Sequence, residues 1–279
     1  MKTMRVLLSL ILVLLSPGLF ADDSEHSEKE ITLGIFPYIS SSKLIHMYTP
    51  LAKYLEAKTS RKVRLVSSPD FKTFIERSEK QQFDIIYTAP HFAELAEQQK
   101  TYRRLARFTR KLSGTFFVRA SSDITNVKQL QNKMVSVPSQ LAIVSHLGEV
   151  HLGEMGLVRS EDYTLKNMPT HNNVIISVLN DVASAGVVAS PVFDLYDRQN
   201  RGKLRKIAQT ECIPGAMFML NNKMSQKDAL ILETAMNEFP LSGHAKAFYS
   251  GSTMVGIQEI TDADMDALKK YRKLLQDYM

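Results

Sequence analysis

The chain has 279 residues, of which 44% are hydrophobic and 23% are charged. These fractions exclude a collagen-like repeat, a coiled coil and an intrinsically disordered chain. The single cysteine, Cys212, excludes an intramolecular disulfide and any multi-cysteine zinc or iron–sulfur site. The formal net charge of +6 raises the question of nucleic-acid binding.

The N-terminal segment has the layout of a secretory signal peptide. Lys2 and Arg5 precede an apolar run over residues 6–15, a helix-breaking Ser-Pro-Gly follows, and Ala21 offers a small residue for cleavage. The apolar run is about half the roughly 20 residues that a membrane-spanning helix needs, so we expect cleavage after Ala21. Removal of residues 1–21 lowers the formal charge from +6 to +4, because two basic residues and no acidic ones are lost. Residues 22–30 are polar and highly charged and predict a short disordered lead-in.

From residue 31 onward the hydrophobic pattern alternates between strands and helices. In chain order it predicts a strand over 31–36, a helix over 42–58, a strand over 63–66, a helix over 71–78, a strand over 83–87, a helix over 90–95 and a strand over 103–109. This β-α-β order is typical of a mostly parallel sheet with helices on both faces.

A second series of the same kind begins near residue 114. It predicts strands over 115–118, 134–137, 163–166 and 186–189, with helices over 141–155, 171–180 and 191–198. The tail then supplies a strand over 216–220 and helices over 226–237, 241–250 and 262–278. We therefore expect an α/β protein with two lobes, 31–110 with 208–279 and 111–207, and crossovers near 110–113 and 200–208. A cleft between such lobes, at the carboxyl ends of strands, is where small ligands bind.

Four stretches, in order along the chain, resemble the phosphonate-binding protein family, the periplasmic binding proteins of ABC transporters. They are ITLGIFPY at 31–38, YTPLAKYL at 48–55, FDIIYTAP at 83–90 and THNNVIISVLNDVASAG at 170–186. The resemblance implies a periplasmic protein with the type II binding-protein fold and two hinge crossovers, without catalysis or cofactor. It also implies a monomer that captures a small oxyanion (phosphonate, phosphite or phosphate) or a related polar solute by hinge closure and delivers it to an ABC permease.

The candidate ligand-binding residues lie at strand ends and helix starts. A helix N-terminus presents free N–H groups and a partial positive charge, which suit a tetrahedral oxyanion. Tyrosine, serine and histidine side chains at such junctions can add donors, and for the histidine it is the family resemblance that implies the role. The six candidates are Tyr38, Tyr87, Ser139, Gln140, His171 and Asn172.

The chain departs from family members that take aminoalkyl phosphonates. Those members carry a Ser-Thr-Ser-Gly-like turn where this chain reads Ser139-Gln140-Leu141-Ala142, and carboxylates where it has Asn172 and Ser184. Without a buried carboxylate an ammonium group would lack a partner, which is unfavourable. We therefore expect a simpler anion or another polar small molecule.

Other functions find less support in the sequence. It contains no nucleophile elbow, P-loop or G-x-G-x-x-G turn, and its histidines lack metal-ligand spacing, so neither an enzyme nor a metal site is predicted. Residues 100–111 include six basic residues, but on a strand these divide between two faces, which favours solvated side chains over a nucleic-acid site. Cys212 is expected to be buried and inert. Two alternatives stay open: the same fold reporting its ligand to a membrane sensor kinase, and a secreted enzyme on a similar fold.

Overall fold

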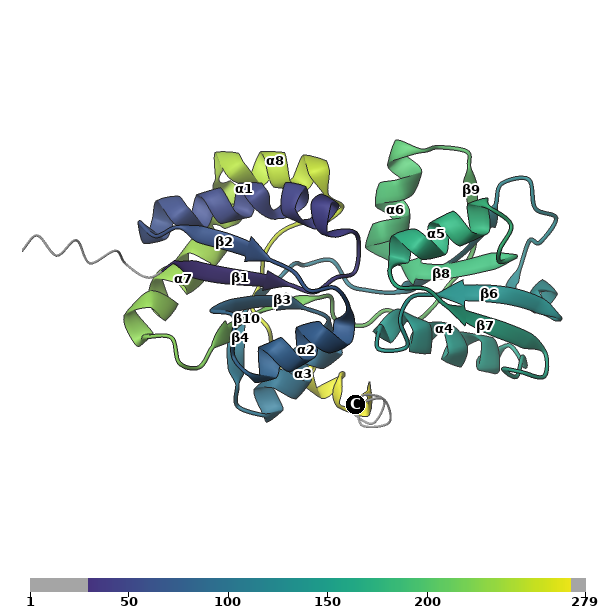
Figure 1. Cartoon of the computed structure of the whole chain (residues 1–279), viewed down its shortest axis with the longest axis horizontal. Coiled ribbons are helices and arrows are strands. Elements are labelled where there is room, and N and C mark those ends of the chain that lie inside the picture. The colour runs from purple at the N-terminus through teal and green to yellow at the C-terminus, as the bar shows by residue number, and fades with distance from the viewer. Residues whose placement is uncertain (1–29, 272–279) are drawn as a thin grey trace, which may run out of the picture.

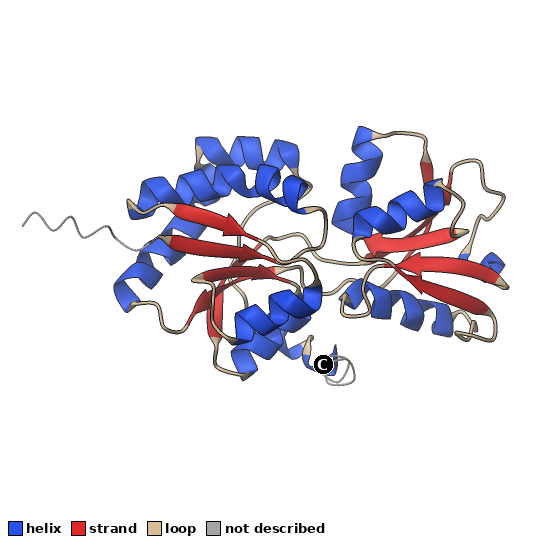
Figure 2. Ribbon diagram, in the orientation of Figure 1, coloured by secondary structure: helices blue, strands red, loops and turns tan. Residues whose placement is uncertain are grey.

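A computed structural model describes residues 30–271 of the chain. The predicted signal peptide, and the predicted lead-in up to residue 29, lie outside the described residues. Residues 30–271 form two α/β lobes side by side, joined by extended segments (Figure 1). Each lobe is built on a five-stranded sheet with helices on both faces (Figure 2), which confirms the predicted fold class. Among these residues, no helix has the length and apolar character needed to cross a membrane.

The first lobe contains the N-terminal elements and the end of the described chain. Its strands are β1 (Ile31–Ile35), β2 (Val63–Val66), β3 (Ile85–Thr88), β4 (Tyr102–Arg107) and β10 (Met217–Asn221), in the order β2-β1-β3-β10-β4. Its helices are α1 (Ser41–Thr59), α2 (Phe71–Glu79), α3 (Pro90–Gln98), α7 (Gln226–Glu238), α8 (Gly243–Gly251) and the short α9 (Asp262–Asp266). Strand β10 is antiparallel to both neighbours, β3 and β4, while β1 pairs with β2 and β3 in parallel. The buried residues of α1, among them Leu44, Tyr48, Leu51 and Leu55, recur at the spacing of one helix face.

The second lobe repeats this plan. Its strands are β5 (Gly114–Arg119), β6 (Lys133–Val137), β7 (Tyr163–Asn167), β8 (Ala185–Ala189) and β9 (Leu204–Gln209), in the order β7-β6-β8-β5-β9. Its helices are α4 (Ile143–Glu154), α5 (His171–Leu179) and α6 (Ser190–Gln199), with α4 on one face and α5 on the other (Figure 1). Here β5 is the antiparallel strand. A Cβ atom at Gly186 in β8 would lie 2.6 Å from the Phe117 ring of the neighbouring strand β5, so the close packing at this position favours glycine.

Two predicted features are wrong in their placement. Residues 200–208 were expected to cross between the lobes, but β9 occupies Leu204–Gln209 and pairs with β5. This strand lies at the edge of its sheet and carries Arg205 and Lys206, so it lacks the apolar run that identifies an inner strand. Of the final helix, expected over 262–278, the described part is helical only over Asp262–Asp266 and is followed by a 3-10 turn at Lys269–Tyr271; residues 272–278 lie outside the described residues.

The two segments that connect the lobes run side by side. The first follows β4 at 108–113 and the second follows β9 at 210–216. The Leu112 N–H donates to the Ile213 carbonyl at 2.9 Å, and the Ile213 N–H donates to the Leu112 carbonyl at 2.8 Å. A Cβ at Gly215 would lie 2.5 Å from the Arg110 carbonyl oxygen. The two connections therefore form a paired ribbon in which only glycine fits at position 215.

The segment after α8 folds back over β4 and covers part of the basic stretch. Arg107 in β4 is buried and forms two hydrogen bonds to the Asp264 carboxylate in α9, at 2.9 and 2.8 Å. Arg104 bonds Glu97 and Asp262 nearer the surface. The expectation of solvated basic side chains is thus wrong for Arg107, because a segment more than 150 residues away in the chain covers it.

Candidate functional site

A cavity lies between the lobes, beside the paired connections. It encloses about 610 Å³ of empty space, counting its opening to solvent. The first lobe, the second lobe and both connecting segments contribute to its walls. The side chains that line it include Phe36, Phe71, Tyr38, Tyr87, Phe108, Arg110, Lys111, Ile143, Val144, His171 and Val192. The interior of the cavity, without its opening, holds about 50 Å³. A cleft between two lobes is a typical place for a small-molecule ligand.

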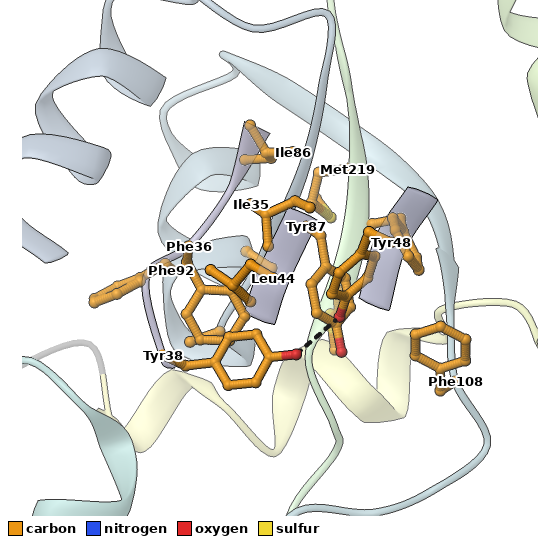
Figure 3. Packing of buried hydrophobic residues seen from close by; sticks show 14 of the residues in the cluster. Ile35, Phe36, Tyr38, Leu44, Tyr48, Ile86, Tyr87, Phe92, Phe108 and Met219 are labelled. Carbon is orange, nitrogen blue, oxygen red and sulfur yellow. Dashed lines mark hydrogen bonds between the residues drawn. The ribbon is translucent and has the colours of Figure 1, made fainter. Parts of the chain in front are cut away.

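Two of the predicted tyrosines form one wall, and their hydroxyls are directed toward a third tyrosine. Tyr38 follows β1, stacks on Phe36 with ring centroids 4.7 Å apart, and has its hydroxyl 3.2 Å from the Tyr48 hydroxyl (Figure 3). The ring of Tyr87, at the end of β3, lies 5.2 Å from that of Tyr48, and the two hydroxyls also interact. Burial raises the pKa of all three phenols. These tyrosines therefore present neutral rings to the cavity, and the hydroxyls of Tyr38 and Tyr48 are hydrogen-bonded to each other.

His171 is the first residue of α5 and contributes a polar group to the cavity. Its side chain is 96% buried, as its exposure is 4%, and burial lowers its pKa to about 3, so the imidazole is neutral at pH 7. The Nδ1 atom accepts a hydrogen bond from the Ala189 N–H at 3.3 Å, which places the ring proton on Nε2. Within residues 30–271, Nε2 has no hydrogen-bond partner in the protein. The His171 N–H donates to the Tyr38 carbonyl at 3.2 Å and so links the two lobes.

The other three sequence candidates lie away from this cavity. The Ser139 Oγ accepts from the Leu141 N–H at 3.3 Å and stabilises its own turn. Gln140 lines a smaller pocket beside His91 and His146, and Asn172 lines a separate groove between α1 and α6. The structure thus brings Tyr38, Tyr87 and His171 together and places Ser139, Gln140 and Asn172 apart from them.

Further contacts between the lobes involve residues that the sequence analysis did not select. The His91 Nε2 lies 2.9 Å from the Leu141 carbonyl, and burial lowers the His91 pKa to about 4. Thr253 donates its hydroxyl to the Pro191 carbonyl at 2.8 Å, and Arg198 donates to the Ser252 carbonyl at 2.8 Å. These groups lie 50 or more residues apart in the sequence, so no local motif indicates the pairs. Together they connect the two lobes in this structure.

The connecting segments carry two cations and the cysteine. Arg110 donates to the Thr253 carbonyl at 3.0 Å and forms an ion pair with Asp194 of α6. Lys111 is exposed where it reaches the cavity. Cys212 is also exposed, so the expectation of a buried thiol is wrong. Its neighbour Glu211 is also exposed, while its other neighbour, Ile213, pairs with Leu112. The paired connecting segments therefore leave the Cys212 side chain in solvent.

Two lobes of this topology, each with one antiparallel strand inside an otherwise parallel sheet and a cavity beside paired connections, define a type II periplasmic binding protein. The chain belongs to the family of phosphonate ABC transporter periplasmic substrate-binding proteins, whose family model matches residues 33–265. Members of this family are solute-binding proteins rather than enzymes, which agrees with the sequence-based resemblance.

Solved structures share the fold at low sequence identity. PhnD1 from Prochlorococcus marinus, in complex with methylphosphonate, matches with a TM-score of 0.78 at 12% identity, covering 89% of this chain and 98% of that one. A binding-protein component of a phosphonate ABC transporter from Pseudomonas aeruginosa matches with a TM-score of 0.76 at 16% identity, covering 88% and 85%. A protein from Xanthomonas citri bound to ATP matches with a TM-score of 0.68 at 17% identity, covering 88% and 97%. Ligands as different as methylphosphonate and ATP occur on this fold, so the fold alone does not specify the cargo.

Proposed function

We propose that the mature chain is an exported, monomeric solute-binding component of an ABC transporter that captures a small solute between its lobes by hinge closure. The observation that carries this proposal is the cavity whose walls come from both lobes, beside a paired hinge. A solute that contacts both lobes stabilises the closed arrangement, because half of its contacts are lost when the lobes separate. The closed form then presents a distinct surface to the permease.

The cargo class proposed from the sequence is a small oxyanion or a related solute. Family membership supports it, and so does the charge at the cavity: Lys111 and Arg110 line it, the latter paired with Asp194, and within the described residues no Asp or Glu lines it. The first turn of α4 contributes N–H groups without helical partners, at the positive end of the helix dipole. An ammonium-bearing solute would meet no carboxylate in these walls.

The experiment is a thermal-shift and small-angle scattering panel on the mature protein, covering phosphate, phosphite, alkyl- and aryl-phosphonates, sulfonates, carboxylates and amino acids. A bound solute at 100 times its dissociation constant stabilises the protein by roughly 2.7 kcal/mol. It should also reduce the radius of gyration as the lobes close. Absence of binding across the panel, or turnover of a compound by the purified protein, would contradict the proposal.

The output of the closed form is tested separately with a candidate ABC permease reconstituted in proteoliposomes. Solute-loaded protein should stimulate ATP hydrolysis by the permease, and solute-free protein should stimulate it much less. Activation of a membrane sensor kinase, without any effect on a permease, would assign the protein to signalling instead.

A further inference from the structure

The walls of the inter-lobe cavity are almost entirely apolar. The first lobe contributes the rings of Phe36, Phe71 and Phe108, and the second lobe contributes the branched side chains of Ile143 and Val192. Burying apolar ligand surface against such walls is favourable at roughly 25 cal/mol per Å². A bare oxyanion covers these walls with polar oxygen atoms and gains little from them.

Few polar groups at the cavity are free to bind a ligand. The Tyr38 hydroxyl is hydrogen-bonded to Tyr48, the Tyr87 ring packs against that of Tyr48, and Arg110 is occupied by Asp194 and a backbone carbonyl. The residues at the start of α4 that reach the cavity are Ala142, Ile143 and Val144, and none of these has a side-chain donor. Polar contacts are thereby restricted to a small part of the cavity.

The donors that stay free gather on the second lobe. His171 is 96% buried (4% exposed), lines the cavity, and has its Nδ1 bonded to Ala189, so the Nε2–H on the opposite edge of the ring is available. Ile143 and Val144, in the first turn of α4, line the same cavity, and their N–H groups lack helical acceptors. Lys111 adds a positive charge at the opening. This set accepts one compact acidic group.

We infer that the cargo is an organic anion with an aromatic or branched aliphatic body and one compact acidic head group. The body lies between the rings of the first lobe and Val192, and the head accepts hydrogen bonds from the His171 Nε2–H and the first turn of α4. This inference rests on the proposed function and narrows it: the apolar body, rather than the acid alone, supplies the selectivity. Inorganic phosphate and phosphite are then poor ligands.

The first test compares ligands that share a head group and differ in body. Isothermal titration calorimetry on the mature protein would use phenylphosphonate, methylphosphonate, inorganic phosphate and benzoate. We expect phenylphosphonate to bind at least about tenfold more tightly than methylphosphonate, because several additional apolar carbons are buried at about 0.8 kcal/mol each. Benzoate should bind and inorganic phosphate should not.

The second test separates the head contact from the fold with two variants of His171. In His171→Asn the amide oxygen can still accept from the Ala189 N–H, while the donor at the Nε2 position is removed. In His171→Gln the amide group lies near the Nε2 position and can restore that donor. We expect at least about a tenfold loss of phenylphosphonate affinity in the first variant and partial recovery in the second, since a hydrogen bond to a charged group contributes roughly 1.5–3 kcal/mol.

The third test addresses the apolar wall. Val192→Thr keeps the side-chain shape but adds a hydroxyl beside the expected body, and should weaken phenylphosphonate about three- to tenfold. Val158→Thr, at a residue 50% exposed and away from the cavity, is the matched control and should leave affinity unchanged. Equal losses in both variants would contradict the placement of the body.

The outcomes distinguish this inference from the function on which it rests. Binding of inorganic phosphate, phosphite or amino acids with no preference for aryl acids would overturn the inference and leave a solute-binding protein. Lack of binding by every compound in the solute panel would overturn both. Tight binding of phenylphosphonate that is insensitive to His171→Asn and Val192→Thr would also overturn the inference, because the ligand would then lie elsewhere.

Discussion

Removal of the Asp264 carboxylate is expected to destabilise the first lobe strongly. The Asp264 carboxylate accepts two hydrogen bonds from Arg107. It accepts two more from Thr261, whose N–H donates at 2.9 Å and whose hydroxyl donates at 3.0 Å. The side chains of Arg107 and Asp264 are only 8% and 11% exposed. Burial by itself would raise the Asp264 pKa, but the hydrogen bonds from Arg107 and Thr261 outweigh it and lower the pKa.

The magnitude follows from what Asp264→Ala leaves behind. The Arg107 guanidinium would stay buried without its carboxylate, and breaking a buried pair in this way costs about 3–5 kcal/mol. Asp262, two residues earlier in α9, is the matched control: its side chain is 91% exposed, although it also pairs with an arginine, Arg104. Asp262→Ala should cost at most about 1 kcal/mol, as surface ion pairs do.

The assay is urea unfolding followed by far-UV circular dichroism, since the chain has no tryptophan. With a denaturant slope of about 3 kcal/mol per molar, Asp264→Ala should lower the unfolding midpoint by about 1–1.7 M. The double variant Arg107→Met/Asp264→Leu should recover most of this loss, because apolar replacement of a whole buried pair is close to neutral. A midpoint for Asp264→Ala equal to that of Asp262→Ala would refute the reasoning.

Three further predictions concern pH, lobe closure and the hinge. His91 and His171 are buried and neutral, with pKa values of about 4 and about 3 against a usual 6.5, so the unfolded chain binds more protons below pH 6.5. The free energy of unfolding that these histidines contribute should therefore be constant above pH 6.5 and decrease from there toward pH 4. In an acid titration of stability, His91→Gln should reduce the slope of this decrease. Arg198→Ala removes a hydrogen bond between the lobes and should weaken phenylphosphonate binding about two- to tenfold, with little change in the melting temperature. If the variant and the unmodified protein bound phenylphosphonate equally tightly, this hydrogen bond would not contribute to lobe closure. Gly215→Ala should push the connecting segments apart, lower the melting temperature and weaken ligand-induced compaction in small-angle scattering; an unchanged protein would mean that the ribbon adjusts freely.

The sequence by itself predicted most of the architecture. The alternation of short apolar strands with amphipathic helices is a local property, because each element shows its own period of hydrophobic residues. The helix α1 and the strands β1, β3 and β8 were predicted close to their observed bounds. Three of the site candidates, Tyr38, Tyr87 and His171, also line the cavity, since the ends of β1 and β3 and the start of α5 all face the gap between the lobes.

Only the tertiary structure decided where the polar groups of these residues point. The Tyr38 hydroxyl turns to Tyr48, and His171 bonds Ala189, which follows it by 18 residues. Strand β9 also depended on tertiary structure, because an edge strand with polar side chains is defined by its pairing with β5 and not by its own pattern.

The apolar character of the cavity was likewise decided by the tertiary structure. Its walls combine side chains such as Phe108 and Val192, which come from opposite lobes and which a local pattern assigns to the core. The sequence thus determined two lobes and a binding cleft, through periodicities that each segment carries within itself. The chemistry of the cleft depended on contacts between segments far apart in the chain, which only the folded molecule brings together.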